Sequence, residues 1–121
     1  MRITGNPMKY PTESAEQITV IQWFRKTYPA VLILHVPNGG YRSKAGGEKL
    51  KLEGVVAGIP DLFIPEWNLW IEMKREKGGS VSPAQKKIIN YLNSIGQTAV
   101  VCRGHKEAIK VCNHTRTIKN S

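Results

Sequence analysis

The segment from residue 69 to residue 102 constrains the fold more than any other part of this sequence. Residues 69–74 and 98–102 are short, mostly apolar runs, and residues 82–95 between them have the pattern of a helix. A strand, a helix and a second strand in this order require a crossover connection, which is typical of parallel neighbours in one sheet. The segment therefore predicts a sheet that is covered by helices.

The helix of this segment has a clearly marked start. Ser82 is a suitable N-cap, Pro83 suits the first helical position, and Gln85 stands three residues after Ser82, as a capping box requires. Apolar residues then recur on one helix face, and Gly96 is suited to end the helix. These apolar residues are Ile88, Leu92 and Ile95.

A first helix is predicted near the N-terminus. It begins either after Thr12 or near Ser14, which has capping-box spacing to Gln17, and Pro29 closes it. Its expected apolar stripe is Ile18, Ile21 and Phe24.

The remaining elements complete the order α-β-β-β-α-β-α. The sequence predicts a strand at 31–36, a basic glycine-rich loop at 41–58 with room for a short helix around 48–53, a strand at 61–65 that turns at 65–68 into the strand 69–74, and a last helix at 105–111. This order predicts an α/β fold with a mixed central sheet flanked by helices.

The charge of the chain points to a polyanionic partner. Eighteen Lys and Arg against nine Asp and Glu give a formal net charge of +9, which favours nucleic acid, although soluble proteins can be basic for other reasons. A chain of 121 residues has the length of one domain, which we expect at residues 13–113, between an N-terminal arm (1–12) and a basic C-terminal tail (114–121). The N-terminus has no apolar signal core, no run approaches the about 20 apolar residues of a membrane span, and there are only two cysteines, so we expect a cytoplasmic protein.

The strand at 69–74 carries charged side chains at alternate positions. Glu72 and Lys74 therefore share one face of the sheet. If residues 61–65 pair with this strand as a hairpin, Asp61 and Glu72 come together at one end, and a divalent cation such as Mg²⁺ would relieve their repulsion. Alternatively, Glu72 and Lys74 are solvated residues of a half-exposed strand, and Asp61 is an ordinary turn residue after proline.

Pro60-Asp61 followed by Glu72-Met73-Lys74 resembles the signature of the PD-(D/E)XK nucleases. The surrounding segments are similar to the VRR-NUC branch, the virus-type replication-repair nucleases, over roughly residues 13–110. These segments are His35-Val36-Pro37-Asn38-Gly39-Gly40, Gly58-Ile59-Pro60-Asp61-Leu62, Ile71-Glu72-Met73-Lys74 and Gly79-Ser80-Val81-Ser82-Pro83-Ala84-Gln85. The resemblance implies a restriction-endonuclease-like core, α-β-β-β-α-β, and a metal-dependent endonuclease that acts on DNA.

Carried over residue by residue, the resemblance implies a metal site. Asp61 and Glu72 would bind Mg²⁺ or Mn²⁺ with help from the Met73 carbonyl, and Lys74 would orient or activate the attacking water. Glu16 matches a glutamate of the first helix that often completes the site. The alternative for Glu16 is a first-turn carboxylate that the helix dipole stabilises.

Three further residues match the family but have structural explanations as well. Gln85 matches a glutamine near the catalytic site, and the capping box with Ser82 explains it equally. Asn38 and His35 fall in the motif after the first strand and would contact phosphate or DNA. The alternatives are a turn residue for Asn38 and a core histidine for His35.

Basic residues around the expected site would hold the DNA backbone without reading its sequence. They are Arg42, Lys44, Lys49, Lys51, Lys86 and Lys87. Stand-alone members of the family, including those of bacteriophages, look like homodimers that cut four-way (Holliday) junctions, so the resemblance implies such a resolvase. A flap or nicking nuclease and a catalytically silent DNA-binding module are the alternatives.

Two other groups of residues have more than one interpretation. Cys102 with His105 and Cys112 with His114 could form a zinc site, or the cysteines could pack in the core as small apolar side chains. Trp67 and Trp70 are candidates for stacking on bases or for a dimer interface, or they could pack in the core.

Overall fold

The computed structural model describes residues 10–37 and 44–120, and a four-stranded sheet lies at its centre. The elements in chain order are α1 (Glu13–Thr27), β1 (Leu34–His35), α2 (Lys44–Leu52), β2 (Leu62–Ile64), the 3-10 turn η1 (Pro65–Trp67), β3 (Leu69–Lys74), α3 (Pro83–Ser94), β4 (Thr98–Arg103) and α4 (His105–Lys119). The strands lie in the order β1-β2-β3-β4.

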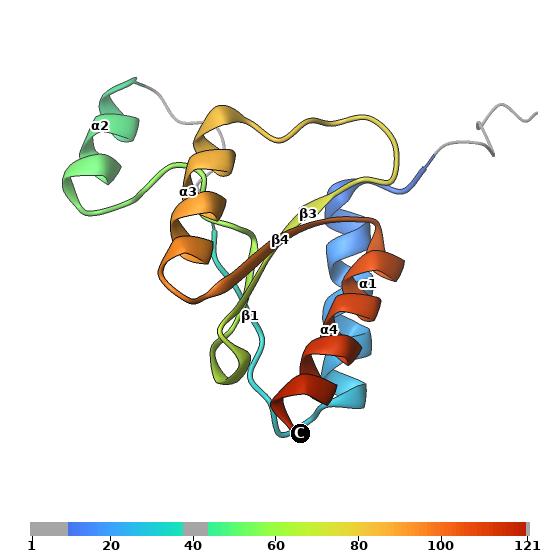
Figure 1. Cartoon of the computed structure of the whole chain (residues 1–121). Helices are drawn as coiled ribbons and strands as arrows, with labels where there is room; N and C mark the ends of the chain where they lie inside the picture. The colour runs from blue at the N-terminus through green and yellow to red at the C-terminus, as the bar shows by residue number, and fades with distance from the viewer. Residues whose placement is uncertain (1–9, 38–43, 121) are drawn as a thin grey trace, which may run out of the picture.

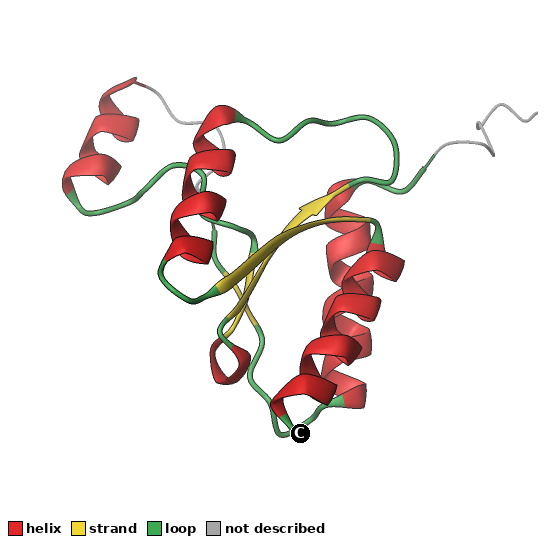
Figure 2. Ribbon diagram, viewed as in Figure 1, coloured by secondary structure: helices red, strands yellow, loops and turns green. Residues whose placement is uncertain are grey.

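The sheet is mixed, as the sequence predicts. β1 pairs with β2 and β2 pairs with β3 in antiparallel fashion, whereas β3 and β4 are parallel and are joined through α3. Figures 1 and 2 show α3 on one face of the sheet and α1 with α4 on the other. The α/β class and the flanked mixed sheet are thereby confirmed.

The hairpin of β2 and β3 sets the register that matters for function. Leu62 lies opposite Ile71, so the residue before Leu62 stands at the end of the ladder next to Glu72. Asn68 adopts a left-handed conformation (φ 50°) at the end of η1, which turns the chain into β3.

The main core lies between the sheet and the pair α1 and α4. Leu69, Ile71 and Met73 are fully buried, and Phe24 of α1 forms an aromatic cluster on the same side. The other members of the cluster are Trp23, Tyr28 and Trp67. Because Trp67 is buried in this cluster, its predicted alternative role in a dimer interface or in base stacking is wrong.

The predicted apolar stripe of α1 is only partly correct. Thr12 is the N-cap and accepts a hydrogen bond from the Ala15 amide, so the alternative start at Ser14 is wrong. The buried positions are Glu16, Val20 and Phe24, which recur every four residues on one face. Ile21 is half-buried beside this face, and the predicted core residue Ile18 is 53% exposed.

Three predicted boundaries differ from the structure because of contacts that the local pattern does not reveal. β1 is shorter than the predicted 31–36, since the Val31 amide bonds to the Tyr28 carbonyl and continues the turn after α1. Residues 44–52 form a helix that begins earlier than the short helix expected around 48–53 in the basic loop, and Gly54 (φ +102°) follows its end. α4 continues to Lys119 and takes in most of the predicted tail, because Tyr28 contacts its second half through Asn113.

The outer edge of β4 is covered by side chains. Asn93 of α3 accepts from the Ala99 amide at 2.9 Å and donates to the Ala99 carbonyl at 3.0 Å. Glu107 of α4 accepts from the Arg103 amide at 2.7 Å. Main-chain groups that face away from β3 thus have hydrogen-bond partners at both ends of the strand.

The described part of the chain contains no helix of the length and apolar character needed to traverse a lipid bilayer.

The core assignment predicts the cost of removing Phe24. Phe24→Ala should lower the free energy of unfolding by about 3–5 kcal/mol, because it leaves a cavity between the three remaining aromatic rings and the sheet. Ile18→Ala on the exposed side of the same helix should change it by at most about 0.5 kcal/mol. Urea unfolding followed by circular dichroism measures both, and equal losses would contradict this packing.

Candidate active site

Asp61 is held from two sides at the open end of the β2–β3 hairpin. Its carboxylate Oδ2 accepts a hydrogen bond from the Met73 amide at 2.8 Å. Its main-chain carbonyl accepts from the Val36 amide at 2.7 Å and lies 3.0 Å from His35 Nδ1. Met73 lies beyond the last β2–β3 pair, so the Asp61 side chain takes the place of a strand neighbour.

Glu72 and Lys74 are both buried beside Asp61. Glu72 is 2% exposed and Lys74 is 6% exposed, and Lys74 Nζ lies 3.5 Å from Glu72 Oε2. The interpretation of both as solvated residues of a half-exposed strand is therefore wrong. Glu72 Oε1 is buried and has no hydrogen-bond partner.

The protonation of Glu72 reflects this environment. Burial and, to a smaller extent, the negative charge of Asp61 raise the pKa of Glu72 from 4.5 to about 7, although the positive charge of Lys74 opposes the rise. Two carboxylates held this close are stable only when a proton or a cation offsets their repulsion. The arrangement thus favours binding of a cation at neutral pH.

The donor set suits a hard divalent cation. Asp61 and Glu72 supply carboxylate oxygens, and Glu72 Oε1 has a free lone pair in a buried position. The Met73 carbonyl lies on the same edge of β3 as its amide, which faces Asp61, because both groups of a strand residue point to one side. Mg²⁺ and Mn²⁺ bind such oxygen ligands, and Mg²⁺ typically uses one or two protein carboxylates plus waters.

Gln85 both caps α3 and contacts the candidate site, two roles that were alternatives in the sequence analysis. The Gln85 side-chain Oε1 accepts a hydrogen bond from the Ser82 main-chain amide at 2.9 Å. The Gln85 main-chain amide donates to Ser82 Oγ at 3.1 Å, which completes the capping box of α3. Its Nε2 donates to Glu72 Oε2 at 2.9 Å. The helix cap therefore also orients a carboxylate of the site.

Glu16 is placed elsewhere. Its Oε1 accepts from the His105 amide at 2.9 Å and lies 2.6 Å from His105 Nδ1, at the start of α4. Burial alone would raise the pKa of Glu16, but the side-chain and main-chain hydrogen bonds from His105 lower it overall. Among the described residues no three His, Cys, Asp or Glu form a group that could hold a metal ion, so Glu16 is not brought together with Asp61 and Glu72.

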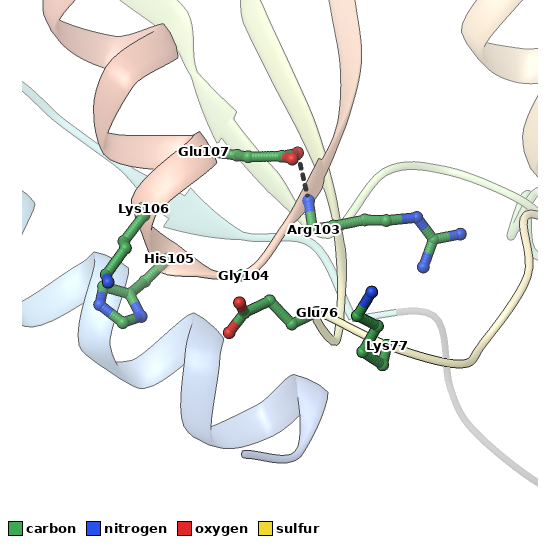
Figure 3. A pocket seen from close by; sticks show the side chains of 7 residues that line it. All are labelled: Glu76, Lys77, Arg103, Gly104, His105, Lys106 and Glu107. Atoms are coloured by element: carbon green, nitrogen blue, oxygen red, sulfur yellow. Dashed lines mark hydrogen bonds between the residues drawn. The ribbon is translucent and has the colours of Figure 1, made fainter. Parts of the chain in front are cut away.

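A cavity of about 290 Å³ lies next to the start of α4 and does not include the carboxylate pair. Figure 3 shows the side chains that line it. They are Glu76, Lys77, Arg103, Gly104, His105, Lys106 and Glu107. The Arg103 guanidinium donates to the carbonyls of Gly78 and Gly79, so it holds the loop after β3 in place.

The lysines expected to contact DNA are exposed where the structure describes them. Lys86 and Lys87 follow Gln85 in the first turns of α3, and Lys49 and Lys51 lie on α2, which projects from the sheet (Figure 1). Asn38 and Arg42 lie outside the described residues, as does the side chain of Lys44.

His35 is exposed, so the expectation of a core histidine is wrong. Its contact with the Asp61 carbonyl, like the bond between Asp61 and the Met73 amide, was not predicted, because both depend on how the end of the sheet closes. Cys102 and Cys112 are buried and free, and burial raises the pKa of both thiols to about 12, as expected for cysteines that pack as apolar side chains. Trp70 stacks on Phe63 with a ring-centroid distance of 4.0 Å.

Comparisons with known proteins agree with this geometry. The family model of the VRR-NUC domain matches residues 11–106. A solved structure described as a VRR_NUC domain protein has a TM-score of 0.70 and 30% sequence identity, and the match covers 87% of this chain and 88% of that chain. A search of curated proteins finds no match.

The raised pKa of Glu72 predicts a pH dependence of stability in metal-free protein. Between pH 4.5 and about 7, Glu72 is protonated in the folded protein and ionised in the unfolded chain. The stability of the folded protein that depends on protonated Glu72 is therefore complete below pH 4.5 and is lost as the pH rises through 7. Relative to Glu72→Gln, the wild type should lose roughly 2–3 kcal/mol of unfolding free energy across this range.

Urea unfolding in EDTA at a series of pH values measures this difference. Glu66→Gln, an exposed position on η1, is the control for loss of a carboxylate and should follow the wild type. Adding Mg²⁺ above neutral pH should stabilise the wild type and not Glu72→Gln. Parallel curves for wild type and Glu72→Gln would contradict the prediction.

Proposed function

The chain belongs to the VRR-NUC domain family, whose members are nucleases of the PD-(D/E)XK type, and from this premise we propose a divalent-metal-dependent endonuclease that hydrolyses phosphodiester bonds of branched DNA. The observation that carries the proposal is the buried pair of Asp61 and Glu72, with the Lys74 ammonium 3.5 Å from Glu72. A buried arrangement of this kind costs folding free energy and is typical of catalytic sites.

Asp61, Glu72 and the Met73 carbonyl would hold the metal ion, Mg²⁺ or Mn²⁺. When bound, the ion polarises the phosphodiester, lowers the pKa of a coordinated water and offsets charge on the phosphate oxygens. Asp61 is already oriented by the Met73 amide, and Glu72 by Gln85, so little reorganisation of these side chains is needed.

Lys74 supplies the positive charge of the site. Its ammonium is a compact donor that can contact the attacking water and a phosphate oxygen without bidentate geometry. Because Lys74 is only 6% exposed and faces Glu72, its charge is held at the reaction site rather than in solvent. It would orient the nucleophile and stabilise the negative charge of the transition state.

DNA would be bound mainly through its phosphates. The formal net charge of +9 favours association with a polyanion, and Lys86 and Lys87 are exposed directly after Gln85. Lys49 and Lys51 of α2 would contact the backbone farther from the site. Such contacts give affinity without base recognition, which suits an enzyme that selects DNA by shape.

We favour a homodimer that cuts four-way junctions, because symmetric cleavage of two strands requires two active sites. A flap or nicking nuclease with one active site per substrate is the second candidate. A catalytically silent DNA-binding module is disfavoured by the assembled set of Asp61, Glu72 and Lys74.

Cleavage of labelled DNA with Mg²⁺ or Mn²⁺ tests the activity. Lys74→Met keeps the bulk of the side chain and removes its charge, so it should lower the single-turnover rate at least about 100-fold. Lys110→Met, on the exposed side of α4, is the matched control and should cut within about twofold of the wild type. Binding without metal-dependent cutting by the wild type would overturn the proposal.

The geometry of the cuts distinguishes junction resolution from flap cleavage. On a four-way junction the wild type should make paired, symmetric incisions and sediment as a dimer. An equimolar mixture of wild type and Lys74→Met should leave many junctions cut in one strand only, because mixed dimers contain one active site. Single cuts near a flap by a monomer would instead support the flap nuclease.

A further inference from the structure

The two sides of the candidate active site come from separate segments that meet at Gly58. Asp61 lies three residues after Gly58, on the segment that leads into β2, and Gln85 lies in the first turn of α3. A Cβ at Gly58 would lie 2.5 Å from the main-chain carbon and oxygen of Ala84 and 2.9 Å from the Gln85 nitrogen. These are main-chain atoms of a helix and cannot rotate away, so only glycine allows this approach.

Hydrogen bonds connect the close contact at Gly58 to the carboxylate pair on both sides. On the helix side, Gln85 Nε2 donates to Glu72 Oε2 at 2.9 Å. On the other side, the chain passes through the buried Pro60 to Asp61, whose Oδ2 accepts from the Met73 amide at 2.8 Å. Glu72 and Met73 are neighbours on β3, so the contacts form a closed ring around Glu72.

Gly54 provides an internal comparison. Gly54 has φ +102° and Gly58 has φ +89°, so an L side chain is strained at both positions. A Cβ at Gly54 would meet no atom within 4 Å, whereas a Cβ at Gly58 would overlap the first turn of α3. The two positions therefore both have a positive φ and differ in the close contact.

We propose that Gly58 is a positioning residue for the nuclease reaction: its main-chain contact with α3 sets the spacing between Asp61 and Gln85 and thereby the orientation of Glu72. This inference rests on the proposed function. A side chain at Gly58 moves α3 away from Glu72 or moves Asp61 away from the Met73 amide. Either displacement disturbs the carboxylate pair and leaves the number and charge of the exposed lysines unchanged.

The test compares Gly58→Ala with Gly54→Ala in the full chain. Gly58→Ala should slow single-turnover junction cleavage about 100-fold, the size of effect that a displacement near 1 Å can have, with a DNA dissociation constant in EDTA within about threefold of the wild type. Gly54→Ala also places an L side chain at a positive φ and should cut within about threefold of the wild type. Equal rates for the two variants would overturn the proposal.

A double-mutant cycle separates positioning from general destabilisation. If Gly58 acts through Gln85, adding Gly58→Ala to Gln85→Met should slow cleavage by much less than Gly58→Ala alone does. Full additivity of the two effects would contradict the ring of contacts. If Gly58→Ala unfolds at the assay temperature, all variants are measured at a lower temperature in trimethylamine N-oxide, which stabilises folded states.

A readout without activity distinguishes failure of this inference from failure of the proposed function. In metal-free protein, the side-chain amide resonances of Gln85 should shift in Gly58→Ala and stay at their wild-type positions in Gly54→Ala. Unchanged Gln85 resonances in Gly58→Ala would overturn the inference. If the Gln85 resonances shift in Gly58→Ala but the wild type cuts no DNA, the positioning contact is supported and the nuclease proposal is contradicted.

Discussion

The repulsion between Asp61 and Glu72 is the constraint on which the rest of the site depends. Burial and the nearby charge of Asp61 raise the pKa of Glu72 to about 7, and the groups around the pair restrain it from several directions. Lys74 lowers its electrostatic cost, Gln85 donates to one oxygen of Glu72, and the Met73 amide binds Asp61. A site of this kind lowers the stability of the folded chain once Glu72 is ionised, and a positive charge beside the pair would offset that loss.

The alternation of side chains along β3 allows the core and the site to coexist on one strand. Leu69, Ile71 and Met73 are buried on the side of α1 and α4, whereas Glu72 and Lys74 face the side of Gln85 and α3. The apolar side supplies the rigidity that the polar side needs, because charged groups that can move apart lose their mutual orientation. The apolar core thus lies on one face of the sheet, and the charged residues of the candidate site lie on the other.

The parts that the sequence predicted correctly depend on local patterns. The pairing of Asp61 with Glu72 follows from a hairpin and strand alternation, and the start of α3 follows from the capping box at Ser82. The place of Glu16 could not be predicted, since its partner His105 is far along the chain and is brought near by packing of α4 on α1. The length of α4 likewise depends on a contact from Tyr28, which no pattern within residues 105–119 reveals.

The covered edge of β4 has a consequence for assembly. An open edge strand can recruit a strand from another molecule, and chains with long open edges tend to form fibrils. Here Asn93 occupies both main-chain groups of Ala99, and Glu107 occupies the Arg103 amide, so an incoming strand meets side chains that already satisfy these groups. A strand of a second copy that pairs along this edge would therefore have to displace Asn93 and Glu107 first.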